Sequence, residues 1–112
     1  MPTQVFATYR LRAETDVAQY EEWSRTVDQP ICLQAESCLS FEVYVVKGGD
    51  ADSAPFNVIE DIVVESWEAW QDTLRSDDLA EMMAQWRQLA DESTLVTVYC
   101  ERIQPTESDP QL

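Results

Sequence analysis

The sequence predicts a single domain of the α+β class, in which an antiparallel sheet carries its helices on one face. Three observations predict this fold. The chain has 112 residues, which is the usual size of one domain. Strand-like and helix-like segments follow one another in the order β-α-β-β-α-β. Apolar residues make up 45% of the chain and include four tryptophans, which is enough for one hydrophobic core.

The first half of the chain predicts a strand, a helix and a second strand. Residues 5–11 are rich in β-branched and aromatic residues and alternate between two faces, as a strand requires. Asp16 is a typical N-cap, and apolar residues follow it at helical spacing. Pro30 should end or interrupt this helix, because a proline disfavours the α conformation of the residue before it. Residues 39–46 alternate again and predict the second strand.

The second half predicts a hairpin, two short helices and a last strand. A polar loop over residues 47–55 holds both glycines and leads into a strand over residues 56–64. Ser66 should cap a short helix, and Asp77 should begin a second helix with apolar residues at i, i+3, i+4 and i+7. The last strand is expected over residues 95–103.

This element order is the ferredoxin-like arrangement. We expect one domain over residues 1–103 and a disordered polar tail over residues 104–112. Helices cover only one face of such a sheet, yet the second face is also apolar. That face should carry Phe6, Tyr44, Val46, Tyr99 and either Val58 and Ile62 or Ile59 and Val63. A second copy of the sheet would cover it, so we expect a homodimer that forms a dimeric α/β barrel.

The charge of the chain excludes several partners. Seven Lys and Arg stand against 22 Asp and Glu, a net charge of −15, which repels the phosphate backbone of a nucleic acid. No apolar run approaches the length of about 18 residues that a membrane helix needs. The start of the chain does not resemble a signal peptide. We therefore expect a cytoplasmic protein that binds neither nucleic acid nor membrane.

The chain has no histidine, which removes Ser-His and Cys-His catalysis and the commonest zinc ligand. The three cysteines, Cys32, Cys38 and Cys100, lack metal-ligand spacing and should be reduced. Asp50 and Asp52 lie in the glycine loop but lack the length and the final Glu of an EF-hand. We expect no metal and no other cofactor.

Glu60 is the first candidate for catalysis. It lies in a strand among aliphatic residues, and a desolvated carboxyl has a raised pKa that suits a general acid or base near neutral pH. The alternative is an ion pair with Arg10 or Arg102. Glu60 and Asp61 must point to opposite faces of the sheet. We expect Glu60 to lie with Tyr44 and Arg10 inside the barrel, around an aromatic ligand.

Asp28 and Cys32 are the next candidates, on either side of the predicted helix end. Asp28 could accept an N–H of an indole or a pyrrole, or it could only form a hydrogen bond at the helix end. Trp23, Trp67 and Trp86 could form the walls of a site for a planar aromatic substrate, or they could belong to the core.

Several segments, in this order, resemble the RedY-like (HapK-like) family: Tyr20-Glu-Glu-Trp23, Asp28-Gln-Pro30 with Cys32, Leu39-Ser-Phe-Glu-Val-Tyr44, and Val64-Glu-Ser-Trp-Glu-Ala-Trp70. The similarity covers roughly residues 4–103. It implies a dimeric α/β barrel without a known cofactor that acts on reactive aromatic intermediates. It also implies a place in bacterial biosynthesis of prodigiosin-type and bisindole pigments, with other enzymes of the pathway as possible partners. No catalytic residue is carried over from the resemblance.

The residues and the resemblance together lead to one expected function. The protein should hold a reactive planar aromatic molecule in an apolar cavity and direct its proton transfer, cyclisation or rearrangement while excluding water. One alternative is a cofactor-free monooxygenase of the same fold. The other is a protein that only binds the intermediate or supports a partner enzyme.

Overall fold

The computed structural model describes residues 2–106, and the chain forms one four-stranded antiparallel sheet. The strands are β1 (Thr3–Leu11), β2 (Cys38–Val45), β3 (Val58–Val64) and β4 (Ala90–Cys100). Their order in the sheet is β2-β3-β1-β4. Most of the tail that was expected to be disordered lies outside the described residues, and its residues 104–106 have no regular secondary structure.

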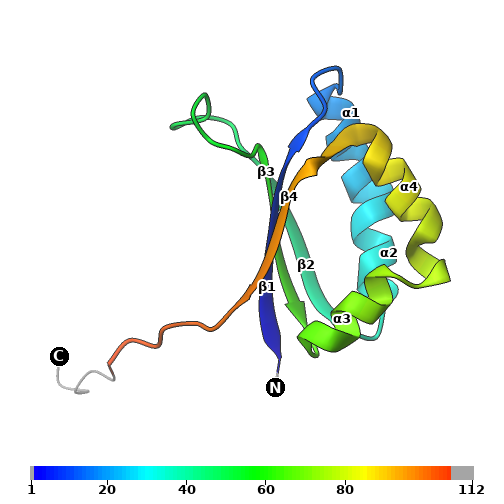
Figure 1. Cartoon of the computed structure of the whole chain (residues 1–112), viewed down its shortest axis with the longest axis vertical. Helices are drawn as coiled ribbons and strands as arrows, with labels where there is room; N and C mark the ends of the chain where they lie inside the picture. Colours follow the sequence, from blue (N-terminus) through cyan, green and yellow to red (C-terminus); the bar gives the residue numbers. More distant parts are fainter. Residues whose placement is uncertain (1, 107–112) are drawn as a thin grey trace.

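All helices pack on the same face of this sheet, and Figure 1 shows the two layers edge-on. They comprise α1 (Val17–Trp23), the π-helical turn η1 (Ser24–Asp28), α2 (Gln29–Gln34), α3 (Trp67–Leu74), the 3-10 turn η2 (Asp77–Leu79) and α4 (Ala80–Leu89). The predicted α+β class and one-sided helical layer are therefore confirmed. In the described part of the chain, every helix is too short or too polar to cross a bilayer.

The first helical segment differs from the prediction at Pro30. The side chain of Asp16 does cap α1, by accepting a hydrogen bond from the backbone N–H of Ala18. Pro30 does not end the segment, because the chain passes through the wider turn η1, where the N–H of Gln29 bonds to the carbonyl of Ser24. Pro30 has no backbone N–H to donate, and the wider π-helical turn lets the helix continue without that hydrogen bond. As a result, Asp28 and Cys32 lie inside a continuous helical segment rather than at its end.

The strand register decides which side chains face the helices. On β1 the helix-facing residues are Val5, Ala7, Tyr9 and Leu11, which are all buried. Ala7 pairs with Glu60 and Phe6 pairs with Asp61. Glu60 therefore faces the helices, and Asp61 faces the other side.

This register corrects the expected position of Glu60. Tyr44 pairs with Ile59, next to Glu60 in sequence, and so lies on the opposite face of the sheet. Arg10 also lies on that face, where its guanidinium donates to the carbonyl of Ala54 at 2.8 Å. The expected group of Glu60, Tyr44 and Arg10 does not form.

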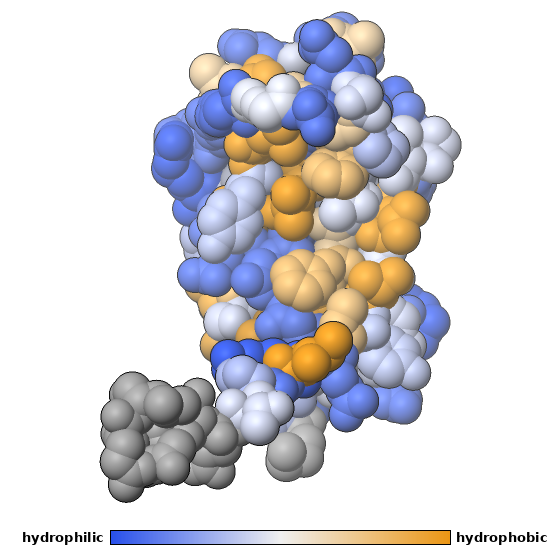
Figure 2. Space-filling view, turned by 90° about the vertical axis from the view of Figure 1, so that its left-hand side faces the viewer, coloured by the Kyte–Doolittle hydropathy of each residue, from blue (hydrophilic) through white to orange (hydrophobic). Residues whose placement is uncertain are grey.

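None of residues 2–106 covers the face of the sheet opposite the helices, and this face carries several apolar side chains. By register these are Phe6, Tyr44, Ile59, Val63, Val96 and Val98. Tyr44, Val96 and Val98 are exposed, by 52%, 57% and 46%. Figure 2 looks onto this face and shows apolar groups running along it between polar ones. Tyr99 was expected here but pairs with Val5, and it lies on the helix side at the β4 edge.

Candidate functional site

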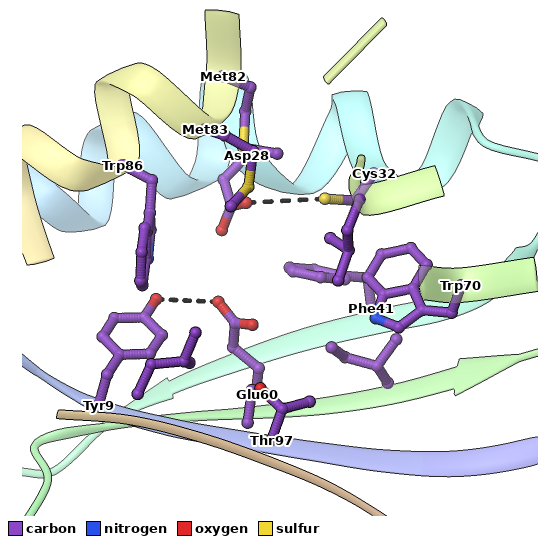
Figure 3. Close-up of a pocket in the computed structure, with 14 residues that line it drawn as sticks. Tyr9, Asp28, Cys32, Phe41, Glu60, Trp70, Met82, Met83, Trp86 and Thr97 are labelled. Atoms are coloured by element: carbon purple, nitrogen blue, oxygen red, sulfur yellow. Dashed lines mark hydrogen bonds between the residues drawn. The ribbon is translucent and has the colours of Figure 1, made fainter. Parts of the chain in front are cut away.

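A cavity of about 70 Å³ lies between the sheet and the helices. Apolar side chains form most of its walls: Ala7, Phe41, Ile62, Trp70, Leu74, Met82, Met83, Trp86 and Leu95. Its polar groups are few, and they are Tyr9, Asp28, Cys32, Glu60 and Thr97. Figure 3 shows Glu60 rising from the sheet and Asp28 reaching down from the helices into the same space.

Glu60 is held in this cavity by β3, whose alternate residues Val58, Ile62 and Val64 are fully buried. The Glu60 residue is only 9% exposed. Its carboxylate accepts a hydrogen bond from the hydroxyl of Tyr9 at 2.9 Å. Burial, and to a smaller extent the nearby charge of Asp28, raise the pKa of Glu60 to about 8, against an opposing effect of the Tyr9 hydrogen bond. Glu60 can therefore hold or release a proton near neutral pH.

Asp28 comes from η1, the wide turn that precedes Pro30. It is 3% exposed. Its carboxylate accepts a long hydrogen bond from the hydroxyl of Ser24 at 3.5 Å and a contact from the thiol of Cys32 at 3.7 Å. Burial raises the pKa of Asp28 to about 7, and the two weak hydrogen bonds only partly oppose it. Asp28 and Glu60 thus titrate as a pair in which one proton is readily retained.

No described Lys or Arg neutralises these two carboxyls. The ion pairs among residues 2–106 lie at the surface and involve other acids, such as the pair of Lys47 with Glu21. Arg10, one of the two predicted partners of Glu60, lies across the sheet, and Arg102 is exposed beyond the end of β4. The ion-pair alternative for Glu60 is therefore not realised. Burying a carboxylate without a cation lowers the stability of the fold, and such carboxyls are typical of functional sites.

Two tyrosines that the sequence analysis did not single out complete the polar part of the site. The hydroxyls of Tyr9 and Tyr20 lie 2.5 Å apart. The ring of Tyr9 also packs edge-on against Trp86, with centroids 5.1 Å apart. Burial and the charge of Glu60 raise the pKa of both phenols. The sequence did not identify Tyr9 as a site residue, because Glu60 was expected on the other face of the sheet. Only the pairing of the strands shows that Tyr9 and Glu60 share a face.

The structure brings together four of the predicted site residues, which are Glu60, Asp28, Cys32 and Trp86. The other four lie elsewhere. Tyr44 and Arg10 are on the uncovered face of the sheet. Trp23 packs in the core and donates its indole N–H to Gln85 at 2.8 Å. Trp67 stacks on Tyr99, with centroids 5.0 Å apart, at the β4 edge. Trp70 lines the cavity, although the prediction did not select it.

The thiol of Cys32 is expected to be unreactive in the folded protein. Burial raises its pKa, and the adjacent Asp28 carboxylate raises it further, so no thiolate forms near neutral pH. Burial also raises the pKa of Cys38, to about 11. Cys32→Ser should leave the number of thiols labelled in the folded protein unchanged, while the number labelled in denaturant falls from three to two. A loss of one label in the folded protein would contradict this expectation.

Residues 2–106 contain no group of three or more His, Cys, Asp or Glu side chains placed to hold a metal ion.

The fold and the site together define a class: a ferredoxin-like α+β protein with a cavity that contains carboxyls between its sheet and its helices. The chain belongs to the family of the REDY-like protein HapK, whose model matches residues 3–103. The predicted family and ferredoxin-like fold are thus confirmed. None of the curated proteins that were compared matches the chain.

Solved structures share this fold at low sequence identity. HapK from Hahella chejuensis has a TM-score of 0.70 at 20% identity, over 97% of this chain and 99% of that one. SnoaB from Streptomyces nogalater, a cofactor-independent oxygenase, has a TM-score of 0.70 at 10% identity, over 96% and 98%. A dimeric protein of unknown function and ferredoxin-like fold from Bacteroides fragilis has a TM-score of 0.65 at 8% identity, over 90% and 96%.

Proposed function

We propose that the protein binds a planar aromatic intermediate in the cavity and moves protons on it with Asp28 and Glu60, without a cofactor. One observation carries the proposal. Two carboxyls without a cation face each other across an apolar cavity, and both have a pKa near neutrality. Such a pair can take a proton from one atom of a substrate and deliver a proton to another. The outcome would be a proton transfer, a cyclisation or a rearrangement.

The walls of the cavity support an aromatic substrate. Phe41, Trp70 and Trp86 offer flat apolar surfaces, and a carboxylate among them can accept the N–H of an indole or a pyrrole. The cavity of about 70 Å³ is small, since an engineered protein cavity that binds benzene measures about 150 Å³. A ring must therefore displace flexible side chains as it enters, and Met82 and Met83 are suited to this. The rest of the substrate would lie toward Leu95 of β4, which lines the cavity and is 36% exposed.

The family membership supports a place for this reaction in the biosynthesis of bisindole or prodigiosin-type pigments. The test is to incubate the purified protein with an unstable bisindole or pyrrole intermediate and to analyse the products. A product profile that differs from the spontaneous one supports catalysis. Slower decay with the same products would instead indicate a protein that only binds the intermediate. Oxygen uptake during turnover would indicate the monooxygenase alternative, and the structurally similar SnoaB is a cofactor-independent oxygenase.

A homodimer through the uncovered face of the sheet is part of the proposal. The exposed Tyr44, Val96 and Val98 support it, as does the dimeric ferredoxin-like protein of the same fold. A dimer doubles the negative charge, so its interface must be apolar enough to outweigh the repulsion.

The wild-type protein should therefore sediment at twice its chain mass of 12.9 kDa. Val98→Asp places a charge in the proposed interface, beside Phe6 of β1, and should produce a monomer. The matched control is Leu33→Asp, because Leu33 is similarly exposed, at 48%, but belongs to α2 in the helical layer. A monomeric wild type, or dissociation by the control variant alone, would contradict this interface.

A further inference from the structure

The two buried carboxyls of the cavity have little to bind within residues 2–106. Asp28 is 3% exposed and Glu60 is 9% exposed. The one described hydrogen bond to the Glu60 carboxyl runs from the Tyr9 hydroxyl to Oε2, at 2.9 Å, and leaves Oε1 without a partner. The carboxyl of Asp28 has only the long contacts with Ser24 and Cys32, at 3.5 Å and 3.7 Å. Both carboxyls therefore keep unused acceptor capacity toward the cavity.

We propose that the cavity takes its aromatic ligand as a cation, with a protonated nitrogen such as that of a conjugated imine or an amidine between Asp28 and Glu60. This inference rests on the proposed function, because it names the charge of the substrate that the same site would bind. A positive N–H group donates charge-assisted hydrogen bonds to carboxylates, and these are about twice as strong as neutral ones. A neutral indole or pyrrole supplies no charge, so the two acids would still have to share a proton.

The walls of the cavity suit a flat cation. In Figure 3, Trp86 lies on one side of the two carboxyls, and Phe41 and Trp70 lie on the other. Aromatic rings attract a nearby positive charge through their faces, and tryptophan does so most strongly. The polarisable sulfurs of Met82 and Met83 also line the cavity. Because most of the lining is apolar, the carboxylates would act on the cation with little screening by water.

The groups around the two carboxyls leave the role of the cation to the ligand. The titratable side chains that face the pair are Tyr9 from β1, Tyr20 from α1 and Cys32 from α2. Burial raises the pKa of all three, so they are uncharged near neutral pH. None of the ion pairs in residues 2–106 includes either carboxyl. The net charge of −15 also attracts cations toward the molecule.

A cationic substrate fits the proton transfer proposed for the cavity. A carboxylate would take a proton from a C–H or N–H bond of a conjugated iminium ion. The electron pair of that bond stays on the ligand, and the proton forms an O–H bond on the carboxyl. Both charges are cancelled in this step, and an apolar cavity favours the uncharged products. The reaction class is the conversion of an iminium ion into a neutral enamine or imine.

The test uses three flat probes of nearly the same shape and different charge. Benzamidine is a cation near neutral pH, benzamide is neutral and benzoate is an anion. Calorimetric titration measures the affinity of each probe. The wild type should bind benzamidine at least about tenfold more tightly than benzamide, and it should not bind benzoate.

The pH dependence of binding shows whether the carboxyls are responsible. The affinity for benzamidine should rise at least about fivefold from about pH 6 to about pH 9, because the two carboxyls lose their protons at pKa values of about 7 and about 8. The affinity for benzamide should not rise over this range, since it gains no partner of opposite charge. A benzamidine affinity that does not change with pH would contradict the proposed contact.

Glu60→Gln should lower the affinity for benzamidine at least about tenfold at about pH 9 and leave the affinity for benzamide unchanged, because it removes a charge but keeps the shape of the side chain. Asp28→Asn makes the equivalent change on the helical side and is the deciding variant if Glu60→Gln does not fold. The matched control is Asp61→Asn, which removes the same charge from the opposite face of β3. It should bind benzamidine like the wild type.

Equal affinity for benzamidine and benzamide, or no binding of benzamidine, would overturn the inference. An equal loss in Asp61→Asn would do the same, because general attraction by the surface charge would then explain the binding. These measurements need no turnover. A protein without preference for benzamidine that still changes the products of a pyrrole or bisindole intermediate would keep the proposed function and lose only the cation. A protein that prefers benzamidine but leaves those products unchanged would keep the cation site and lose the proposed catalysis.

Discussion

Glu60→Gln should lower the turnover of the aromatic substrate by about 10²- to 10⁴-fold, which is the usual contribution of a general acid or base. Glutamine has the same shape and can still accept the 2.9 Å hydrogen bond from Tyr9, so the fold and the cavity should persist. It cannot take up or release a proton. The measurement is the rate of product formation from the same bisindole or pyrrole intermediate, compared at equal protein concentration.

The chain offers a closely matched control in the next residue. Asp61→Asn makes the same chemical change one position along β3, but Asp61 lies on the uncovered face and accepts a hydrogen bond from Gln4 at 2.5 Å. This variant should turn over like the wild type. A Glu60→Gln variant with wild-type rate would show that the carboxyl has no acid-base role, and confinement in the cavity would then account for any change in products.

The elements of the fold were predictable because their signals are local. The alternation in β1, the N-cap at Asp16 and the cap at Ser66 each depend on a few neighbouring residues, and the structure has all three. The uncovered apolar face could also be foreseen, since helices can cover only one side of such a sheet. Glu60 could be selected as a candidate because a carboxyl among aliphatic residues in a strand is desolvated, which raises its pKa.

The composition of the site could not be predicted, because it depends on pairing between distant strands. Alternation shows that Glu60 and Asp61 point to opposite faces, but it does not show which of them faces the helices. That choice is fixed by the pairing of Ala7 with Glu60, more than 50 residues apart in sequence. Only this pairing brings the hydroxyl of Tyr9 to Glu60 and removes Tyr44 and Arg10 from the site.

The position of Asp28 depends on a second nonlocal effect. A proline predicts a helix end from local sterics alone. In the structure, packing against the sheet keeps the helical segment together. The wider turn η1 allows the helix to continue although Pro30 has no N–H to donate. Asp28 therefore points into the cavity instead of capping a helix, and this could be known only once the helical layer was placed on the sheet.

The stability of the wild-type protein should fall as the pH rises from about 4.5 through about 8. Burial raises the pKa of Glu60 from 4.5 to about 8 and that of Asp28 from 3.8 to about 7. In this range the folded protein binds more protons than the unfolded chain, so each step up in pH favours unfolding. The stabilisation that comes from protonating these two carboxyls is complete below their pKa values in the unfolded chain. It is lost above their pKa values in the folded protein. For Glu60 it corresponds to about 5 kcal/mol in the free energy of unfolding, at 1.36 kcal/mol per pKa unit.

Urea unfolding at a series of pH values measures this effect, and the variants separate it from the general repulsion of a chain with a charge of −15. Glu60→Gln should flatten the dependence and make the protein more stable than the wild type above pH 8, because a neutral amide replaces a buried charge. Asp61→Asn changes the net charge equally but leaves the buried pair intact, so its curve should keep the wild-type slope. Parallel curves for the wild type and Glu60→Gln would mean that Glu60 is already ionised in the folded protein near pH 7. The carboxyl pair could not then retain a proton for the acid-base chemistry proposed for the cavity.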